Sequence, residues 1–468
     1  MNLLARNFAL LSLGEFASKI CGFIAFAYLA RVLGPREFGQ LEFALALMFF
    51  LSLFVDCGLG SYGAREVARD ESAVTHLTVR IMFARCLLAV VAFAILLFVV
   101  AFLNKPWPVQ RLILLYGLTL FVQIGLLPWV FQGRDLMAYV ALASAMRWLI
   151  FAAGVVILVA NPVKIWIVPL VEVAALLCVV AYYWAMFQKR FGRLEIRSNF
   201  RHDFALLRCA WPIGASELVW ALKMYFATVL LGFMIYGPEV GWFGAAHRLV
   251  MSLHAFVWLY FFNLLPSISR GTSGDGDTLQ RLMRNSLQIT GWVGVFVALL
   301  GTALAGPLLS TVYGAQYEPA VTVFQVLIWL IPLALVSGHF RYSLIAYDRQ
   351  GLEFFTAACG AALNVILNLA FNASAGIIGA AVSLVIAEGV ICGLSYLMVY
   401  KTIVHIPVGM YLWKPLIGAA VLAAVLQVMP PINIWIVGAT TVILFFALLS
   451  VSHRTLFADL RSLLARCR

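Results

Sequence analysis

The chain has 468 residues, of which 64% are hydrophobic and 11% are charged, and its mean hydropathy is +1.00. A soluble domain has about 45–50% apolar and about 25% charged residues, so this composition excludes one. Nucleic-acid binding would require a basic face with a reading module, so we interpret the net charge of +12 as loop charge that sets membrane topology. The eight cysteines show no CxxC or CxxH spacing, so we expect no metal site and no cofactor.

Apolar blocks of about 17 to 26 residues follow one another from Phe8 to Val451, and each is long enough to cross a bilayer. The sequence therefore predicts an all-α integral membrane protein with about 14 transmembrane helices. The expected spans are residues 7–30, 41–62, 83–103, 112–131, 139–160, 165–187, 209–235, 246–268, 286–312, 321–345, 353–372, 377–400, 414–430 and 433–451.

Basic residues concentrate in every second loop. If the N-terminus lies inside, the inside loops hold most of the 32 Lys and Arg residues, and our count assigns Arg85 and Arg147 to them. Loops rich in Lys and Arg stay in the cytoplasm, so both termini are predicted to be cytoplasmic.

An internal repeat is indicated by two Gly-Pro elements. Gly34-Pro35 follows the first span and Gly237-Pro238 follows the seventh, and each is followed by an apolar residue and Gly. A period of six spans is typical of transporters built from two parallel repeats, although Gly-Pro can also mark unrelated turns. This pattern predicts an N-terminal six-helix lobe over 1–190, a basic cytoplasmic linker over 191–208, a C-terminal six-helix lobe over 209–400, and two additional helices with a basic tail over 401–468.

Ionisable residues inside spans are costly in lipid and normally face the interior of the bundle. Six of them belong to the first two spans of each predicted half: Glu15, Lys19, Asp56, Glu217, Lys223 and His254. Lysines suit an anionic group such as phosphate, and buried acids can hold a coupling proton. The acid-first spacing of Glu15 and Lys19 also fits a purely structural ion pair.

A polar stripe runs along the eleventh span at four-residue spacing, through Asn364, Asn368 and Asn372. Such a stripe can join helices by hydrogen bonds or can contribute to a binding site, and the spacing alone leaves both interpretations open.

Five motifs in chain order resemble those of one transporter family. They are Ala30-Arg31-Val32-Leu33-Gly34-Pro35 with Phe38-Gly39; Ala64-Arg65-Glu66-Val67-Ala68-Arg69; Gly237-Pro238 with Val240-Gly241 and Ala245-Ala246-His247-Arg248-Leu249; Tyr313-Gly314 with Tyr317 and Ala320; and Asn364, Asn368, Gly376, Gly379-Ala380-Ala381 and Glu388. Together they resemble O-antigen flippases, the polysaccharide-biosynthesis branch of the multidrug/oligosaccharidyl-lipid/polysaccharide exporter superfamily.

The resemblance implies two pseudo-symmetric six-helix lobes in a V around a central cavity, in the bacterial cytoplasmic (inner) membrane. The implied cargo is a polyprenyl-diphosphate-linked oligosaccharide, an O-antigen or exopolysaccharide unit on undecaprenyl diphosphate, moved to the periplasmic leaflet by alternating access. Implied partners are membrane lipids, a proton or sodium ion, and polysaccharide polymerase and chain-length machinery. We expect a transporter and no enzyme.

The cavity is predicted to bind phosphate or sugar through Lys19, Lys223, Arg31, Arg248 and His254, and to couple ions through Glu15, Asp56 and Glu217. An ion gradient or the membrane potential is the expected energy source, because no GxxxxGK[ST] phosphate loop is present. Two alternatives remain. A drug or cation antiporter predicts an acidic cavity, and a membrane O-antigen polymerase or ligase predicts a long external loop.

Overall fold

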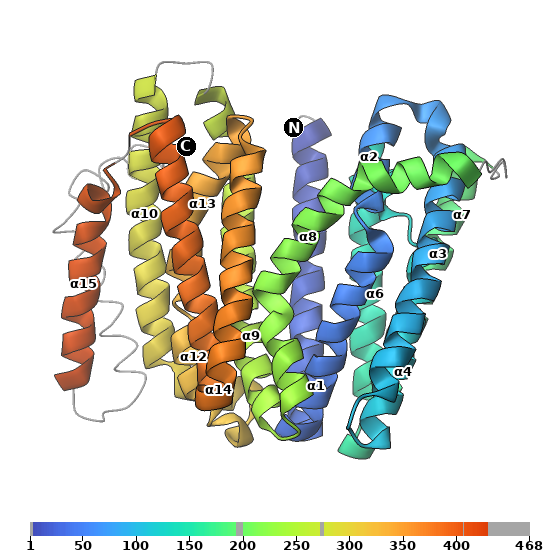
Figure 1. Cartoon of the computed structure of the whole chain (residues 1–468), viewed down its shortest axis with the longest axis horizontal. Coiled ribbons are helices and arrows are strands. Elements are labelled where there is room, and N and C mark those ends of the chain that lie inside the picture. Colours follow the sequence, from blue (N-terminus) through green and yellow to red (C-terminus); the bar gives the residue numbers. More distant parts are fainter. Residues whose placement is uncertain (1–2, 193–199, 272–275, 406, 429–468) are drawn as a thin grey trace. The chain divides into compact units, whose positions relative to one another are not determined.

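The computed structural model describes residues 3–192, 200–271, 276–405 and 407–428. It describes the backbone alone for 3–17, 200–205, 270–271, 276–279 and 421–428, and for positions 281, 373, 410 and 419. Every regular element in these ranges is helical, as the sequence predicts. The α-helices are α1 (Leu3–Asp56), α2 (Leu59–Arg69), α3 (Val74–Ala101), α4 (Trp107–Val122), α5 (Pro128–Gly133), α6 (Met137–Leu158), α7 (Ile167–Phe191), α8 (Phe200–Met234), α9 (Glu239–Gly271), α10 (Gly276–Ala303), α11 (Ala305–Tyr313), α12 (Ala320–Leu327), α13 (Leu330–Ala346), α14 (Gln350–Thr402) and α15 (Val408–Val428) (Figure 1).

Two of the long helices are each broken by a glycine with positive φ. Gly34 has φ 78° and ψ 166° inside α1, and Gly376 has φ 53° and ψ −134° inside α14. Glycine tolerates these angles because it has no Cβ. The chain turns back at both points, so each helix forms two arms (Figure 1). The first arm of α1 covers the expected span 7–30, and the arms of α14 cover 353–372 and 377–400. The expected span 41–62 is not one helix, because α1 ends at Asp56 and α2 begins at Leu59.

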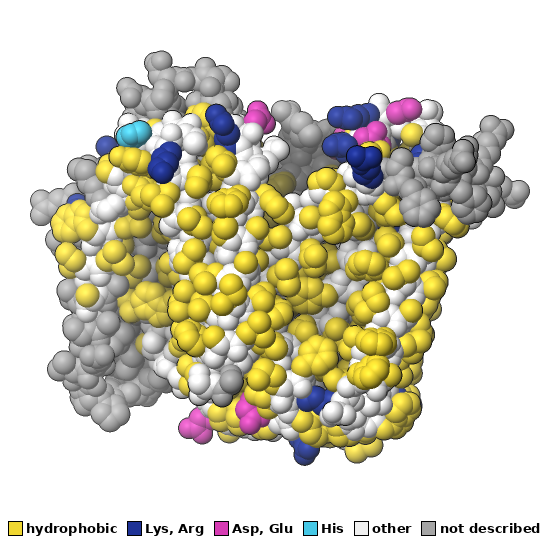
Figure 2. Space-filling view, viewed as in Figure 1, with side chains coloured by type: hydrophobic (Ala, Val, Ile, Leu, Met, Phe, Trp, Pro, Cys, Tyr) yellow, Lys and Arg dark blue, Asp and Glu magenta, His cyan; other side chains and the backbone are white. Residues whose placement is uncertain are grey.

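Eleven stretches among the described residues are long and apolar enough to cross a membrane, and the first, Ser18–Arg69, contains the break at Gly34. Hydrophobic side chains cover the flanks of the helices in Figure 2, while most charged side chains lie near the helix ends. This distribution fits a multi-pass membrane protein. The expected span 433–451 lies outside the described residues.

The chain divides into two compact units, Met1–Gly244 (unit 1) and Ala245–Arg468 (unit 2). Unit 1 includes α8 because this helix packs against α1, α2 and α3. The predicted lobes, 1–190 and 209–400, would separate α8 from these helices, and that division remains a prediction.

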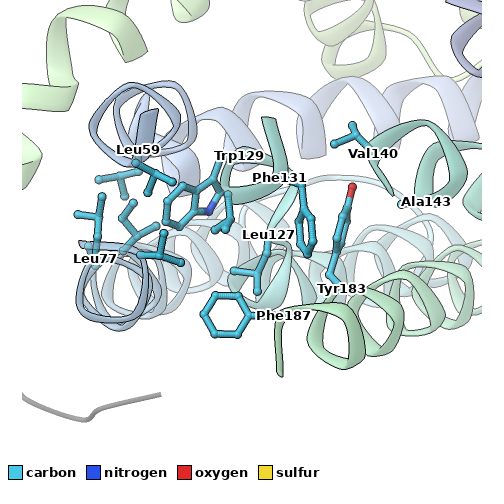
Figure 3. Packing of buried hydrophobic residues seen from close by; sticks show 14 of the residues in the cluster. Leu59, Leu77, Leu127, Trp129, Phe131, Val140, Ala143, Tyr183 and Phe187 are labelled. Carbon is cyan, nitrogen blue, oxygen red and sulfur yellow. The ribbon is translucent and has the colours of Figure 1, made fainter. Parts of the chain in front are cut away.

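A hydrophobic core holds one end of unit 1 together (Figure 3). Trp129 and Phe131 of the short helix α5 are almost fully buried among side chains of α2, α3, α6 and α7. The ring of Phe131 lies 5.3 Å from that of Tyr183, centroid to centroid. Gly63 of α2 lets the Trp129 ring approach, since a Cβ at this glycine would lie 2.6 Å from the ring. This core fixes the position where α2 meets α5.

The two Gly-Pro elements pack directly on each other within unit 1. A Cβ on Gly39 would lie 2.6 Å from the backbone nitrogen of Gly241, and a Cβ on Gly241 would collide with the carbonyl oxygen of Pro35. The two small residues therefore permit a close backbone approach between the turn of α1 and the start of α9.

Unit 2 has its own buried cluster between α9, α10, α13 and α14. Ile268, Met283, Leu287, Phe340, Leu344 and Val399 form its centre. This cluster and the arms of α14 position the polar side chains of unit 2.

Candidate transport site

The junction between α1 and α2 places a carboxylate at a helix break inside a candidate span. Asp56 is the last residue of α1, and the next two residues, Cys57 and Gly58, have φ of 47° and 76°. The backbone nitrogen of Gly60 donates to Asp56 Oδ2 at 3.3 Å. The side chain of Asp56 therefore satisfies one of the backbone donors that the helix break leaves.

Arg85 of α3 completes this junction. Its Nη2 donates to Asp56 Oδ1 at 2.5 Å, and its Nη1 donates to the carbonyl oxygen of Leu126 at 2.9 Å. The side chains of Arg85 and Asp56 are 5% and 18% exposed. Our count placed Arg85 in a cytoplasmic loop, although it falls within the expected span 83–103. That assignment was wrong, because α3 runs from Val74 to Ala101 and the arginine lies inside it.

The helix α8 reaches the same junction through a glycine contact. A Cβ on Gly214 would lie 2.7 Å from the carbonyl carbon of Cys57, so the two backbones touch. One turn further along α8, Glu217 Oε1 accepts a hydrogen bond from Ser61 Oγ at 3.5 Å. Glu217 also lies within electrostatic range of Asp56. The structure thus brings two of the predicted ion-coupling acids together. The side chain of the third, Glu15, lies outside the described residues.

The two predicted lysines lie well inside their helices. Lys19 stands 15 residues before the break at Gly34, and Lys223 stands 11 residues before the end of α8. At 1.5 Å per residue these intervals are about 22 Å and about 16 Å. Because the turns beyond both helices touch, both lysines lie far from that end of unit 1. Lys19 is exposed, and Lys223 is 5% exposed.

The other three predicted cavity residues belong to α1 and α9. Arg31 is exposed and lies near the turn of α1, three residues before Gly34. Arg248 and His254 are half-buried on the part of α9 that belongs to unit 2. Their binding roles remain predictions.

The end of α8 is held by a lysine at the turn opposite the α1–α2 junction. Lys105 Nζ donates to the carbonyl oxygen of Ile235 at 2.6 Å. It lies 5.3 Å from the centroid of the Tyr236 ring, and Arg36 lies 4.8 Å from the same ring. Partial burial lowers the pKa of Lys105 below its ordinary value of 10.5, because desolvation disfavours the charged form.

The asparagine stripe lies in the seam between the two arms of α14. Thr356 Oγ1 accepts a hydrogen bond from Ser395 Oγ at 3.1 Å, and a Cβ on Gly360 would collide with the side chain of Ile391. These two contacts show which residues of the two arms face each other. Asn364 and Asn368 continue the same row at four-residue spacing and are fully buried. Asn368 Nδ2 donates to the Asn364 carbonyl and Oδ1, both at 2.8 Å. Both bonds lie within one arm of α14, so the two interpretations of the stripe stay open.

Unit 2 holds a chain of polar contacts to which the sequence assigned no role. Tyr260 and Ser286 hydroxyls lie 2.5 Å apart, and Ser286 Oγ lies 2.6 Å from His339 Nε2. The Tyr260 side chain also lines an open hollow of about 420 Å³ on α9, together with Phe256 and Asn263. His339 was visible in the sequence as an ionisable residue inside a span, but its partners come from other helices.

A second ion pair crosses unit 1 between α6 and α7. Arg147 donates through Nε at 3.1 Å, and also through Nη2, to Glu172 Oε1. Our count also placed Arg147 in a loop, although it falls within the expected span 139–160. That assignment was wrong, because Arg147 lies at the middle of α6. Over the described residues, no three His, Cys, Asp or Glu side chains are arranged to hold a metal ion.

Solved structures with a similar fold include membrane transporters. The lipid II flippase MurJ, in an inward closed conformation, matches with a TM-score of 0.76 at 14% identity, covering 96% of this chain and 100% of MurJ. An inward-facing MATE multidrug transporter of the MOP superfamily matches with a TM-score of 0.65 at 14% identity, covering 81% and 93%. At this identity the likeness establishes a shared fold.

Sequence relatives are also named as transporters. A protein of Escherichia coli (strain K12) with the name "Putative O-antigen transporter" is 23% identical over 404 residues, which is 85% of this chain and 96% of the relative. A protein of Shigella dysenteriae with the same name is 25% identical over 330 residues, covering 67% and 78%. Residues 4–272 match the family described as "Polysaccharide biosynthesis protein", which is more than half of the chain. The chain therefore belongs to the polysaccharide biosynthesis protein family, and it has the fold of MurJ and the MATE transporters.

Proposed function

We propose that this protein is a flippase for lipid-linked oligosaccharides in the bacterial inner membrane. It moves an O-antigen or exopolysaccharide unit, attached to undecaprenyl diphosphate, from the cytoplasmic to the periplasmic leaflet, and its termini lie in the cytoplasm. The names of its relatives and the MurJ-like fold support this proposal. Polymerase and chain-length machinery are the partners that would use the delivered unit.

The observation that carries the proposal is an exposed cation near the middle of the first arm of α1. Lys19 lies about 22 Å along α1 from the Gly34 break and is exposed. A charged side chain at this depth costs about 2.5–3.5 kcal/mol against lipid, so Lys19 is best accommodated beside water or an anionic ligand. A diphosphate headgroup needs such cations, because it cannot shed its water into hydrocarbon.

The α1–α2 junction supports ion coupling through Glu217. Asp56 is already neutralised by Arg85 at 2.5 Å, whereas Glu217 has one long hydrogen bond, 3.5 Å from Ser61. We therefore assign the exchange of a proton or sodium ion to Glu217, with Asp56 as a fixed neighbouring charge. Binding and release of the cation would bias alternating access, since it changes the net charge beside a helix break.

Reconstituted vesicles test the proposal. The purified protein is placed in proteoliposomes with a fluorescent undecaprenyl-diphosphate oligosaccharide, and a membrane-impermeant reagent measures how much cargo reaches the opposite leaflet. We expect translocation above that of protein-free vesicles and an accumulation of lipid-linked units in cells that lack the gene. Transport of a cationic dye without glycolipid translocation would contradict the proposal and favour the antiporter alternative.

A further inference from the structure

Arg147 occupies a position that needs a functional explanation. It lies 10 residues after Met137 and 11 before Leu158, the two ends of α6, and so about 15 Å from each end. Its side chain is 38% exposed. This distance is longer than an arginine side chain, so snorkelling cannot bring the guanidinium to either membrane surface. The exposed part of Arg147 therefore requires water or an anion within the membrane.

Glu172 of α7 holds the guanidinium in one orientation. Both described hydrogen bonds from Arg147, through Nε and Nη2, end on the same carboxylate oxygen, Oε1. The side chain of Glu172 is 9% exposed, so the pair is buried on the glutamate side and open on the arginine side. A guanidinium has five N–H donors, and these two contacts leave Nη1 for a second acceptor.

Trp148 connects this pair to α1. The guanidinium of Arg147 lies 5.1 Å from the centroid of the Trp148 ring. A Cβ on Gly22 of α1 would lie 3.0 Å from the same ring, and the Phe26 ring lies 6.3 Å from it. The aromatic ring therefore sits between the arginine and the surface of α1, and it fixes the distance between the two helices.

Lys19 is on the side of α1 that faces Trp148 and is at a similar depth to Arg147. It precedes Gly22 by three residues, and residues three apart share a helix face. The helices α1 and α6 run in the same direction here, because Gly22 meets Trp148 and Tyr28 Oη donates to the carbonyl oxygen of Val159 at 3.0 Å. Counting back along both helices places Lys19 and Arg147 within about one turn of each other.

We propose that Arg147 and Lys19 form a binding subsite in unit 1 for the diphosphate group of a lipid-linked cargo, with Glu172 as the positioning residue of Arg147. The inference rests on the proposed flippase function and names the part of the cargo that this site recognises. A planar guanidinium can bind phosphate oxygens through two parallel hydrogen bonds, whereas the lysine contributes a point charge. Both groups are cationic, which favours an anionic diphosphate over a neutral headgroup.

Lipid binding by the full-length protein tests the subsite. Affinities for undecaprenyl diphosphate and undecaprenyl monophosphate are measured in detergent micelles for wild type and for Arg147→Ala, Arg147→Lys and Glu172→Gln. We expect Arg147→Ala to weaken diphosphate binding about 10- to 100-fold, the effect of one lost charge-assisted contact. Arg147→Lys keeps the charge and should retain part of the affinity, which keeps the test informative if the alanine variant does not fold.

Glu172→Gln tests positioning rather than charge. We expect Glu172→Gln to reduce the preference for diphosphate over monophosphate, and Glu172→Asp to restore part of that preference. A merely structural role of Glu172 would instead change the affinities for both lipids equally. The control is Arg111→Ala, which removes an exposed arginine that lies 4.4 Å from the Trp166 ring, in the first two turns of α4. This variant should bind both lipids like wild type.

Two results separate this inference from the proposed function. If folded Arg147→Ala and Arg147→Lys bind undecaprenyl diphosphate as tightly as wild type, the subsite is overturned and the flippase proposal stays intact. A wild-type protein that translocates no undecaprenyl-diphosphate glycolipid, although it binds the lipid through Arg147, would overturn the flippase function and leave the subsite standing.

Discussion

Arg85 and Asp56 join two helix breaks across unit 1. The 2.5 Å ion pair fixes the α1–α2 junction, and the second contact of Arg85, 2.9 Å to the carbonyl oxygen of Leu126, fixes the segment before α5. Pro128 follows that segment and has no N–H to donate. Gln123 adds a contact between the same regions, because its Nε2 donates to the Ser52 carbonyl at 3.0 Å. Arg85 therefore stabilises two backbone segments that lack regular helical hydrogen bonds.

Arg85→Met should destabilise the protein by about 3–5 kcal/mol, because it leaves the carboxylate of Asp56 without its partner in a largely buried position. Thermal unfolding in detergent, followed by tryptophan fluorescence, measures this loss. The double variant Asp56→Asn with Arg85→Met should recover part of the stability, since it removes the stranded charge. Equal unfolding temperatures for the single and double variants would contradict the ion-pair account.

Glu217→Gln should flatten the dependence of transport rate on pH. The substitution keeps the size of the side chain and its contact with Ser61, but it removes the group that exchanges a cation. Proteoliposomes with an imposed pH gradient measure the effect. The matched control is Glu66→Gln, an acid of α2 that pairs with the exposed Arg69. An unchanged pH profile in Glu217→Gln would remove Glu217 from ion coupling.

Gly34→Ala should impair folding of α1. At φ 78° and ψ 166° the backbone lies in a region that only glycine adopts readily, and the strain on another residue is about 1–3 kcal/mol. We expect lower yield and an earlier unfolding midpoint. Gly389→Ala is the control, because a Cβ there meets nothing within 4 Å and helix propensity favours alanine. Normal expression and stability of Gly34→Ala would show that the turn does not need glycine.

The helices were predictable because a bilayer demands long apolar stretches, and the chain shows them as separate blocks. The breaks were only partly predictable. Gly34-Pro35 is visible as a turn signal, whereas the junction at Cys57 and Gly58 lies within a continuous apolar run. The contacts at this junction, from Arg85 to Asp56 and from Gly214 to Cys57, come from other helices, so the local sequence does not reveal them.

The site was harder to predict than the fold, because its contacts join different helices. Residue spacing in the sequence predicts neighbours within one helix but not contacts between helices. Arg85 pairs with Asp56 and Arg147 pairs with Glu172, at separations of 29 and 25 residues. Charge counting treats such arginines as loop residues, since it cannot show that a carboxylate faces them across the bundle. The asparagine stripe was different, because its four-residue spacing already placed Asn364 and Asn368 on one face of a helix, where their side chains are hydrogen-bonded.

Lys19→Ala and Lys223→Ala should each lower glycolipid translocation about tenfold or more, the effect of losing one charge-assisted contact to phosphate, without lowering the amount of protein in the membrane. Lys19 is exposed and Lys223 is 5% exposed, so the two variants also test whether both cations reach the cargo at some stage of transport. The readout is translocation in proteoliposomes, normalised to protein amount. Lys164→Ala is the control, because it removes an exposed cation from the loop before α7. Wild-type rates in both Lys19→Ala and Lys223→Ala would exclude these lysines from phosphate recognition, whereas a loss confined to Lys19→Ala would assign that role to the side of unit 1 that carries Arg147.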